Sequence, residues 1–223
     1  KVKTLDIESA GATITTTLDL GNSSDVSTIK ADLGTGDSLK VTKVDGQTLT
    51  LTEAENGGTL EAVLTDDSGS ADTLTFKLDP ADATAIAQNT APKLKTSDVE
   101  TITIKGDTAQ PATIDLSEIS MDAATATTTL KLTTGKKPIT VIATHEDINV
   151  IDASGLGEGG SLIQSNSTNA GARSRTDSVT YTGSDGSDTL IMANKDDVID
   201  AGTQPTGANG DTLSLIHISE PTR

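Results

Sequence analysis

The segment Thr73-Leu74-Thr75-Phe76-Lys77-Leu78 places an apolar residue at every second position, with threonine or lysine between them. Successive side chains of an extended strand point to opposite faces, so this pattern predicts a strand with one buried and one exposed face. The same alternation occurs in Thr48-Leu49-Thr50-Leu51-Thr52 and in Thr101-Ile102-Thr103-Ile104-Lys105. Shorter alternating positions are Ile114/Leu116, Leu130/Leu132, Ile139/Val141, Ile148/Val150 and Leu162. Regular short strands separated by Gly, Asp, Asn or Ser indicate an all-β sandwich, barrel or solenoid.

The composition favours one of these architectures. Of 223 residues, 39 are Thr and 24 are Asp, whereas only Phe76 and Tyr181 are aromatic. A stack of coils can bury small aliphatic side chains in a narrow interior, because each coil is covered by the next. Such a fold needs no aromatic core. We therefore expect an all-β chain that forms a right-handed parallel β-solenoid or β-roll.

The charge and the missing residue types exclude several functions. The formal net charge is −17, whereas binding of nucleic acid requires a cationic surface. The absence of Cys excludes disulfides, thiol catalysis and thiolate metal sites. No run approaches the roughly 18 apolar residues that a membrane helix needs. We therefore expect neither a nucleic-acid partner nor a transmembrane segment.

The chain divides into three regions and a tail. Residues 1–92 are expected to be irregular β structure, either solenoid or sandwich, with one short helix near residues 79–88. Asp79 would cap this helix and Pro80 would occupy its first turn. Residues 96–176 contain the densest run of strands and are expected to form a Thr-rich β-solenoid. Residues 177–213 change to short units rich in Gly and Asp.

Both ends of the chain differ from the rest. The opening KVKTLDIESA has neither an initiator Met nor the apolar stretch of a secretory signal, which predicts an internal piece of a longer protein. The closing LSLIHISEPTR, Leu213 to Arg223, breaks the Asp/Gly/Thr composition and resembles a translated sequencing-adaptor read-through. We treat residues 214–223 as a non-native tail, which removes His217 as a candidate ligand or base.

The stretch with the most specific pattern is Gly183-Ser184-Asp185-Gly186-Ser187-Asp188-Thr189-Leu190-Ile191. It fits the nonapeptide G-G-x-G-x-D-x-U-x, in which U is a large apolar residue, with Ser184 in place of the second Gly. The next unit, Met192 to Asp200, keeps the Asp and the apolar position but lacks the glycines. A third unit, Gly207 to Leu213, follows an insertion around residues 203–206.

This nonapeptide resembles the calcium-binding repeat of RTX proteins. Two nonamers make one coil of such a roll, so the resemblance implies that Asp188 and Asp211 face one side and Asp197 the other. Glycines let the turn carbonyls point inward, and the carboxylates complete the six or so oxygen ligands of calcium. The apolar residues that would point into the roll are Leu190, Ile199 and Leu213. The implied calcium-site residues are Gly183, Asp185, Gly186, Asp188, Asp197, Asp200 and Asp211.

A simpler interpretation of these acidic residues stays open. Under it, Asp185, Asp188, Asp196, Asp197 and Asp200 form a solvated acidic turn region that favours solubility and binds no metal.

The resemblance extends upstream over about residues 96–213. The phrases Asp98 to Ile104, Ala112 to Ser117 and Ile148 to Leu156 are similar to the Thr-rich β-solenoid of bacterial surface-layer proteins and large RTX adhesins. In those families such a stretch runs into nonapeptide repeats, as it does here near Val179. The resemblance implies type I secretion and assembly in calcium outside the cell. The chain departs from the pattern in the missing second Gly, the insertion around Thr203 and the absence of a C-terminal secretion signal.

We therefore expect a non-enzymatic, exported structural protein, a segment of a bacterial surface-layer protein or RTX-type adhesin that folds or assembles on binding calcium. Its expected partners are calcium ions and either further copies of itself or a cell-surface polysaccharide. Its expected location is extracellular, secreted or on the cell surface. The alternatives are the non-catalytic repeat region of a secreted RTX hydrolase or lyase, and a trimeric phage-fibre β-solenoid without calcium dependence.

Catalytic chemistry is poorly represented in the sequence. His145 lies in a polar segment, and no G-x-S-x-G nucleophile motif occurs. His145 and Asp147 alone are too few for a zinc site, which takes three or four ligands. Two carboxylates suffice for a glycosidase, but such sites also present aromatic or basic residues to the sugar, and this chain has almost no aromatics. We expect no enzymatic activity.

Overall fold

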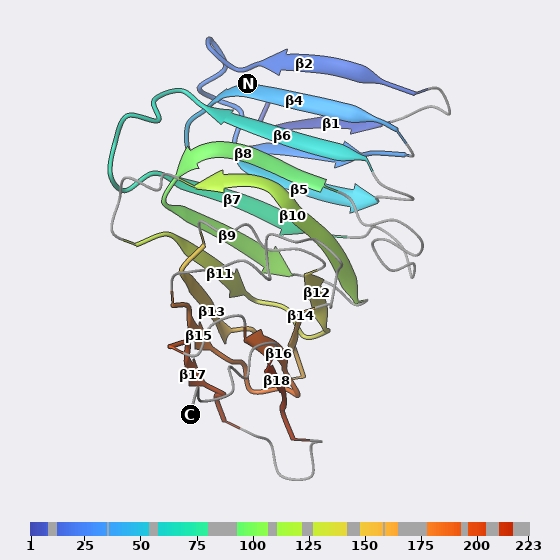
Figure 1. Ribbon diagram of the computed structural model, residues 1–223. Coiled ribbons are helices and arrows are strands. Elements are labelled where there is room, and N and C mark those ends of the chain that lie inside the picture. Colours follow the sequence, from blue (N-terminus) through green and yellow to red (C-terminus); the bar gives the residue numbers. More distant parts are fainter. Residues whose placement is uncertain are drawn as a thin grey trace.

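The protein is a stack of β-strands (Figure 1). A computed structural model describes residues 1–8, 13–34, 36–53, 58–79, 93–106, 111–121, 127–141, 148–157, 159–164, 178–192, 196–203 and 210–215. Within these ranges every regular element is a strand, which confirms the all-β prediction.

The strands form two sheets, and consecutive strands alternate between them. The first sheet contains, in spatial order, β1 (Thr4–Glu8), β3 (Thr28–Asp32), β5 (Thr48–Glu53), β7 (Thr73–Leu78), β9 (Thr101–Gly106), β11 (Thr129–Thr133), β13 (Val150–Gly155), β15 (Thr180–Thr182) and β17 (Val198–Asp200). The second contains β2 (Thr15–Asp19), β4 (Ser38–Val44), β6 (Thr59–Leu64), β8 (Lys93–Val99), β10 (Ala112–Met121), β12 (Ile139–Val141), β14 (Leu162–Gln164), β16 (Thr189–Met192) and β18 (Thr212–Leu215).

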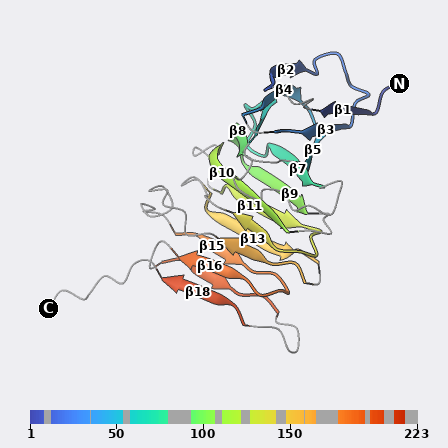
Figure 2. The ribbon, with the colours of Figure 1, turned by 90° about the vertical axis from the view of Figure 1, so that its right-hand side faces the viewer.

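All neighbouring strands of each sheet pair in parallel, for example β7 with β9 and β8 with β10. Each coil therefore adds one strand to each sheet, and the coils stack along one axis (Figure 2). This arrangement is a parallel β-solenoid, as the sequence predicts.

The interior is built from aliphatic side chains that stack in register. One column runs through Ile29, Leu49, Phe76, Ile104 and Leu132, which are register partners on successive strands. All five are 0% exposed. Burial of one such side chain stabilises the fold by roughly 1.5 to 3 kcal/mol. Vertical stacking therefore supplies the hydrophobic core that the alternation predicts.

The outer face of the first sheet carries threonine in the positions between the buried residues. Thr28, Thr48, Thr75 and Thr103 are register partners on β3, β5, β7 and β9. A β-branched side chain suits an extended backbone, and its hydroxyl remains hydrated on the outer face. The high Thr content of the chain thus follows from the outer surface of the coils.

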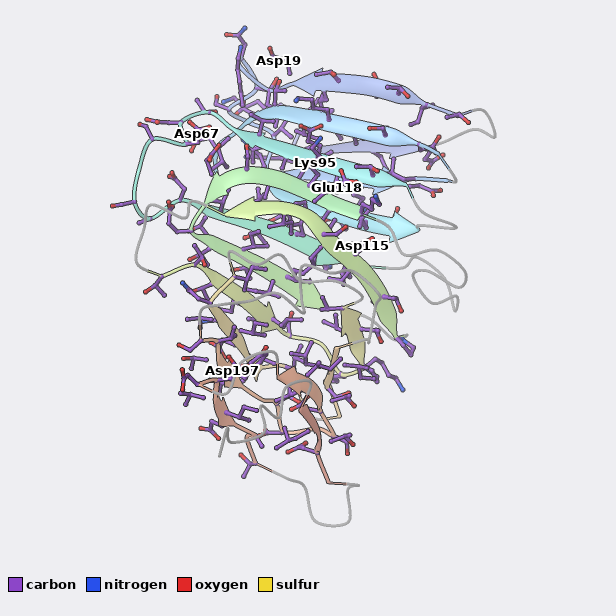
Figure 3. The ribbon with its side chains drawn as sticks, in the orientation of Figure 1. Asp19, Asp67, Lys95, Asp115, Glu118 and Asp197 are labelled. Atoms are coloured by element: carbon purple, nitrogen blue, oxygen red, sulfur yellow. The ribbon has the colours of Figure 1, made fainter. Side chains whose placement is uncertain are left out.

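The outer face of the second sheet carries alternating charges on successive coils. Glu61 on β6 lies between Lys40 on β4, at 2.8 Å, and Lys95 on β8, at 4.0 Å. Lys95 is in turn the register partner of Glu118 on β10 (Figure 3). A third ion pair on this face joins Lys93 to Glu118 at 2.6 Å. These pairs place opposite charges next to each other where strands of one sheet meet.

The first region is more regular than the sequence analysis suggests. Strands β1 to β7 fall within residues 1–79 and belong to the same two sheets as the rest. The prediction of irregular structure is therefore wrong for this part. The short helix expected near residues 79–88 lies, beyond Asp79, outside the described residues.

The two sheets run through all three regions into which the sequence was divided. Strand β6 pairs with β8, and β13 pairs with β15. The expected boundaries near residues 92 and 176 themselves lie outside the described residues.

One alternating pair also differs in detail. Ile148 is buried, but Val150 is half-buried on the outer side, and Ile151 takes the inward position.

Candidate metal centre

The turn at residues 183–188 connects β15 to β16 and contains the glycines of the nonapeptide. A Cβ atom on Gly186 would overlap the carbonyl oxygen of Gly160, in the turn of the preceding coil. A Cβ atom on Gly183 would lie 2.5 Å from the carbonyl oxygen of Ala201, in the following coil. These two glycines are therefore required because the turns stack directly on one another.

Asp188, directly before β16, is 1% exposed and accepts hydrogen bonds on both carboxylate oxygens. Its Oδ1 accepts the backbone N–H of Leu162, in the preceding coil, at 2.6 Å. Its Oδ2 accepts the backbone N–H of Ser184, in its own turn, at 2.6 Å. The hydroxyl of Ser184 lies 2.9 Å from Oδ1. The carboxylate thus joins its own turn to the preceding coil.

The surroundings of Asp188 have opposing effects on its pKa. Burial has the largest effect and raises the pKa of Asp188. The N–H groups of Leu162 and Ser184 stabilise the ionised form and act in the opposite direction, whereas the nearby carboxylate of Asp211 raises the pKa further. The net result is a pKa above the ordinary value for Asp.

The other two motif aspartates make the same contact to the coil below. Asp211, before β18, accepts the backbone N–H of Asp188 at 2.9 Å. Asp197, before β17, accepts the backbone N–H of Val179 at 2.8 Å. Because β16 and β18 belong to one sheet and β17 to the other, the expected placement of Asp188 and Asp211 opposite Asp197 is confirmed.

The same device occurs in three upstream coils that the sequence analysis did not single out. In each, the residue directly before a strand uses a side-chain oxygen to accept the backbone N–H of its register partner in the preceding coil. The pairs are Asp37 with Ile14 at 2.7 Å, Glu100 with Asp72 at 2.6 Å and Asn149 with Thr128 at 2.8 Å. These contacts extend the ladder of strand hydrogen bonds by one position.

A sequence signal for one of these positions exists. Gly36-Asp37-Ser38-Leu39 differs only in Ser38 from the phrase Gly210-Asp211-Thr212-Leu213 near the other end of the chain. Asp37 also resembles Asp188 in accepting a bond from its own turn, the N–H of Gly34 at 2.6 Å. Glu100 and Asn149 share only an acceptor side chain directly before a strand, which is too short a signal to recognise among so many polar residues.

The remaining expected calcium ligands lie at the surface. Asp185 and Asp200 are exposed, and Asp200 Oδ1 accepts the backbone N–H of Gly202 at 3.1 Å. The backbone carbonyl of Asp200 accepts the N–H of Gly183 at 2.7 Å, so the turn after β15 and the end of β17 are in contact. Across the described ranges, no group of three or more His, Asp or Glu side chains is placed to hold a metal ion.

The donor set divides into two classes. Both oxygens of Asp188 accept hydrogen bonds from N–H donors, which leaves this buried carboxylate less available to calcium than an exposed one. Asp185 and Asp200 are exposed carboxylates on adjacent coils and do fit the oxygen chemistry of calcium.

The apolar positions of the three units differ in burial. Leu190 is 0% exposed, Ile199 packs against the core and Leu213 is 50% exposed. Leu213 is exposed because β18 is the last strand of its sheet in the described part of the chain, so no further strand covers it.

The histidine considered above, His145, and its neighbour Asp147 lie outside the described residues.

Comparisons with known proteins do not assign the chain to a family. No family model, no curated protein and no solved structure matches the chain. None of the described residues belongs to a helix long and apolar enough to cross a membrane.

Proposed function

We propose that the chain is a non-enzymatic structural segment of an exported bacterial surface protein, of the surface-layer or RTX-adhesin type. The observation that supports this proposal is the continuous stack of coils, in which two parallel sheets run through the described part of the chain. Such a stack is suited to hold distant parts of a protein apart, because each coil contacts only its neighbours and further coils lengthen it.

We propose further that calcium stabilises the coils near residues 183–203. Asp185 and Asp200 are exposed carboxylates that would hold the ion, together with backbone carbonyls of the turn. When bound, calcium would cancel part of the negative charge that repels neighbouring turns in a chain of net charge −17. Extracellular calcium modules have dissociation constants of about 10⁻⁴ to 10⁻³ M, so such a site fills outside the cell and empties inside it.

Gly183, Gly186 and the buried Asp188 allow the turn before β16 to pack against its neighbouring coils in the absence of an ion. Asp188, Asp197 and Asp211 each hold a backbone N–H of the coil below. Calcium would therefore add stability to coils that already have their hydrogen-bonded frame, with a gain that depends on the ratio of calcium concentration to dissociation constant. The proposed partners beyond calcium are further copies of the chain or a cell-surface polysaccharide.

Terbium luminescence tests the proposed calcium site. Tyr181 is the only tyrosine and Trp is absent, so sensitised emission from Tb³⁺ reports only ions bound close to Tyr181. Tyr181 lies on β15, two residues before Gly183, and its hydroxyl donates to the carbonyl of Ile191 at 3.2 Å. We expect emission in the wild type that calcium displaces, and loss of that emission in the double variant D185N/D200N.

The double variant D6N/E8Q is the matched control, because Asp6 and Glu8 are exposed carboxylates on β1, at the opposite end of the stack. It removes the same number of charges and should leave the emission unchanged. The proposal fails if the wild type gives no sensitised emission and melts at the same temperature in calcium and in chelator.

A further inference from the structure

Asp72 and Glu100 form a pair of carboxylates on adjacent coils, far from the nonapeptide turns. Asp72 lies directly before β7 and Glu100 directly before β9. Because Thr73 and Thr101 are register partners, Asp72 and Glu100 occupy the same position of successive coils. The backbone N–H of Asp72 donates to Glu100 Oε2 at 2.6 Å, and the N–H of Thr101 donates to the carbonyl of Asp72 at 3.0 Å.

This pair differs from Asp188 in its unsatisfied oxygen atoms. Glu100 is 4% exposed, and its Oε1 is buried without a hydrogen-bond partner. Oδ2 of Asp72 is likewise buried without a partner. By contrast, both oxygens of Asp188 accept bonds from N–H donors. None of the ion pairs found among the described residues involves Asp72 or Glu100.

Two unsatisfied carboxylate oxygens in neighbouring coils are unfavourable without a positive charge. Removal of an ionised oxygen from water costs free energy unless a donor or a cation replaces the water. Two like charges at adjacent register positions also repel each other. No Lys or Arg of the described residues offsets either effect by an ion pair with Asp72 or Glu100.

The segment in front of β7 contributes to the same surroundings. The carboxylate of Asp72 lies beneath Gly69, where an added Cβ atom would be 3.0 Å from Oδ1 of Asp72. Gly69 thus allows the backbone of this segment to approach the carboxylate closely. Backbone carbonyls and water can complete the coordination of a hard cation that two carboxylates begin.

We propose that Asp72 and Glu100 hold a divalent cation of the calcium type between the coils of β7 and β9. The ion takes Oδ2 of Asp72 and Oε1 of Glu100 as ligands, while Oε2 of Glu100 keeps its bond to the N–H of Asp72. It fastens the two coils together at a point where the described side chains leave negative charge unbalanced. This site is independent of the one proposed near residues 183–203.

Calorimetric titration with calcium chloride tests this site in the D185N/D200N chain, in which the other proposed site is disabled. We expect one equivalent of calcium to bind to this parent and none to bind after Glu100→Gln is added. Asp6→Asn in the same parent is the control for loss of one charge and should leave the binding unchanged. Asp72→Asn is a second variant that removes the other carboxylate and should also abolish binding.

Thermal melting gives a second readout on the same variants. A glutamine at position 100 keeps an acceptor for the N–H of Asp72 and removes one of the two like charges, so the E100Q chain should melt at a higher temperature than its parent in chelator. Calcium should raise the melting temperature of the parent but not of E100Q. The proposal is overturned if the parent binds no calcium, or if E100Q binds it as the parent does. Sensitised emission near Tyr181 in the otherwise wild-type E100Q chain should be unaffected, which keeps the two proposed sites distinguishable.

Discussion

Oδ1 of Asp188 lies 2.6 Å from the backbone nitrogen of Leu162, 26 residues earlier in the chain. This bond continues the ladder between β14 and β16 past the first residue of the strand, in a place where no backbone carbonyl serves as the acceptor. Its counterparts at Asp37, Glu100, Asn149, Asp197 and Asp211 show that the device recurs along the solenoid. A polar side chain directly before a strand thus secures six of the described strands to the preceding coil.

Removal of the Asp188 carboxylate should destabilise the C-terminal coils. Asp188→Ala leaves the buried N–H groups of Leu162 and Ser184 without an acceptor. Each unsatisfied buried donor costs roughly 1 to 3 kcal/mol, so for the two donors we expect a loss of about 2 to 6 kcal/mol in the free energy of unfolding. Urea denaturation in chelator measures it. Asp185→Ala, at an exposed position of the same turn, should change the free energy by less than about 0.5 kcal/mol. Equal effects of the two substitutions would contradict the assigned role of Asp188.

The raised pKa of Asp188 predicts a pH dependence of stability. A carboxyl group whose folded pKa lies above its unfolded value contributes stability that is fully present below the unfolded value of 3.8. That contribution is lost as the pH rises through the folded pKa.

The stability of the wild type relative to Asp188→Asn should therefore fall as the pH rises above 3.8, by at most about 1.4 kcal/mol per pH unit. Denaturation of both proteins from pH 3 to pH 7, at constant ionic strength, measures the difference. A difference that stays constant with pH would show that burial of this carboxyl has no net effect on its ionisation.

Close stacking of the turns predicts that two glycines of the motif region respond differently to alanine. In Gly186→Ala the new Cβ would overlap the carbonyl of Gly160, so the turns must move apart, at a cost of about 1 to 3 kcal/mol. An added Cβ at Gly210 meets nothing within 4 Å, so Gly210→Ala should leave stability nearly unchanged. Melting temperatures of the two variants test this expectation, which is refuted if G210A is as unstable as G186A.

The charges on the outer face of the second sheet should contribute little and should depend on salt. Glu61→Gln removes the carboxylate that lies between Lys40 and Lys95, all three of them partly solvent-exposed. Exposed ion pairs contribute about 0.2 to 1 kcal/mol, and roughly 1 M salt screens them almost completely. We expect a small loss of stability in low salt that disappears in high salt. A loss that persists at high salt would indicate packing by the Glu61 side chain instead of charge.

Much of the fold could be predicted from the sequence because its strands alternate strictly. Leu74, Phe76 and Leu78 are all buried, as are Ile102 and Ile104, in agreement with the period of two. The first region was expected to be irregular although β5 and β7 alternate strictly, because some of its other strands carry few large apolar residues. Strand β2, for example, reads Thr15-Thr16-Thr17-Leu18-Asp19 and has only one. Its place in the sheet comes from pairing with β4, which a local pattern does not reveal.

The candidate site was predicted less well than the fold. The spacing of the nonapeptide follows the stacking of coils: Gly183 and Gly186 lie in the turn before β16, and Asp188, Asp197 and Asp211 each lie directly before a strand. It could not separate Asp188, which is buried and hydrogen-bonded, from Asp185, which is exposed. The sequence pattern treats both as acidic turn residues, whereas their chemical availability depends on the backbone donors of another coil. The unsatisfied oxygens of Asp72 and Glu100 likewise arise only from three-dimensional placement.

The hydrogen bond from a side chain to the preceding coil joins two residues that are 18 positions apart in the sequence for Asp197 and Val179. For Glu100 and Asp72 the separation is 28 positions. The rise from one coil to the next nevertheless stays near the strand spacing of about 4.8 Å. The number of residues per coil therefore varies while the spacing between neighbouring paired strands stays the same. The length of the stack is therefore set by the number of coils and does not depend on how many residues each coil contains.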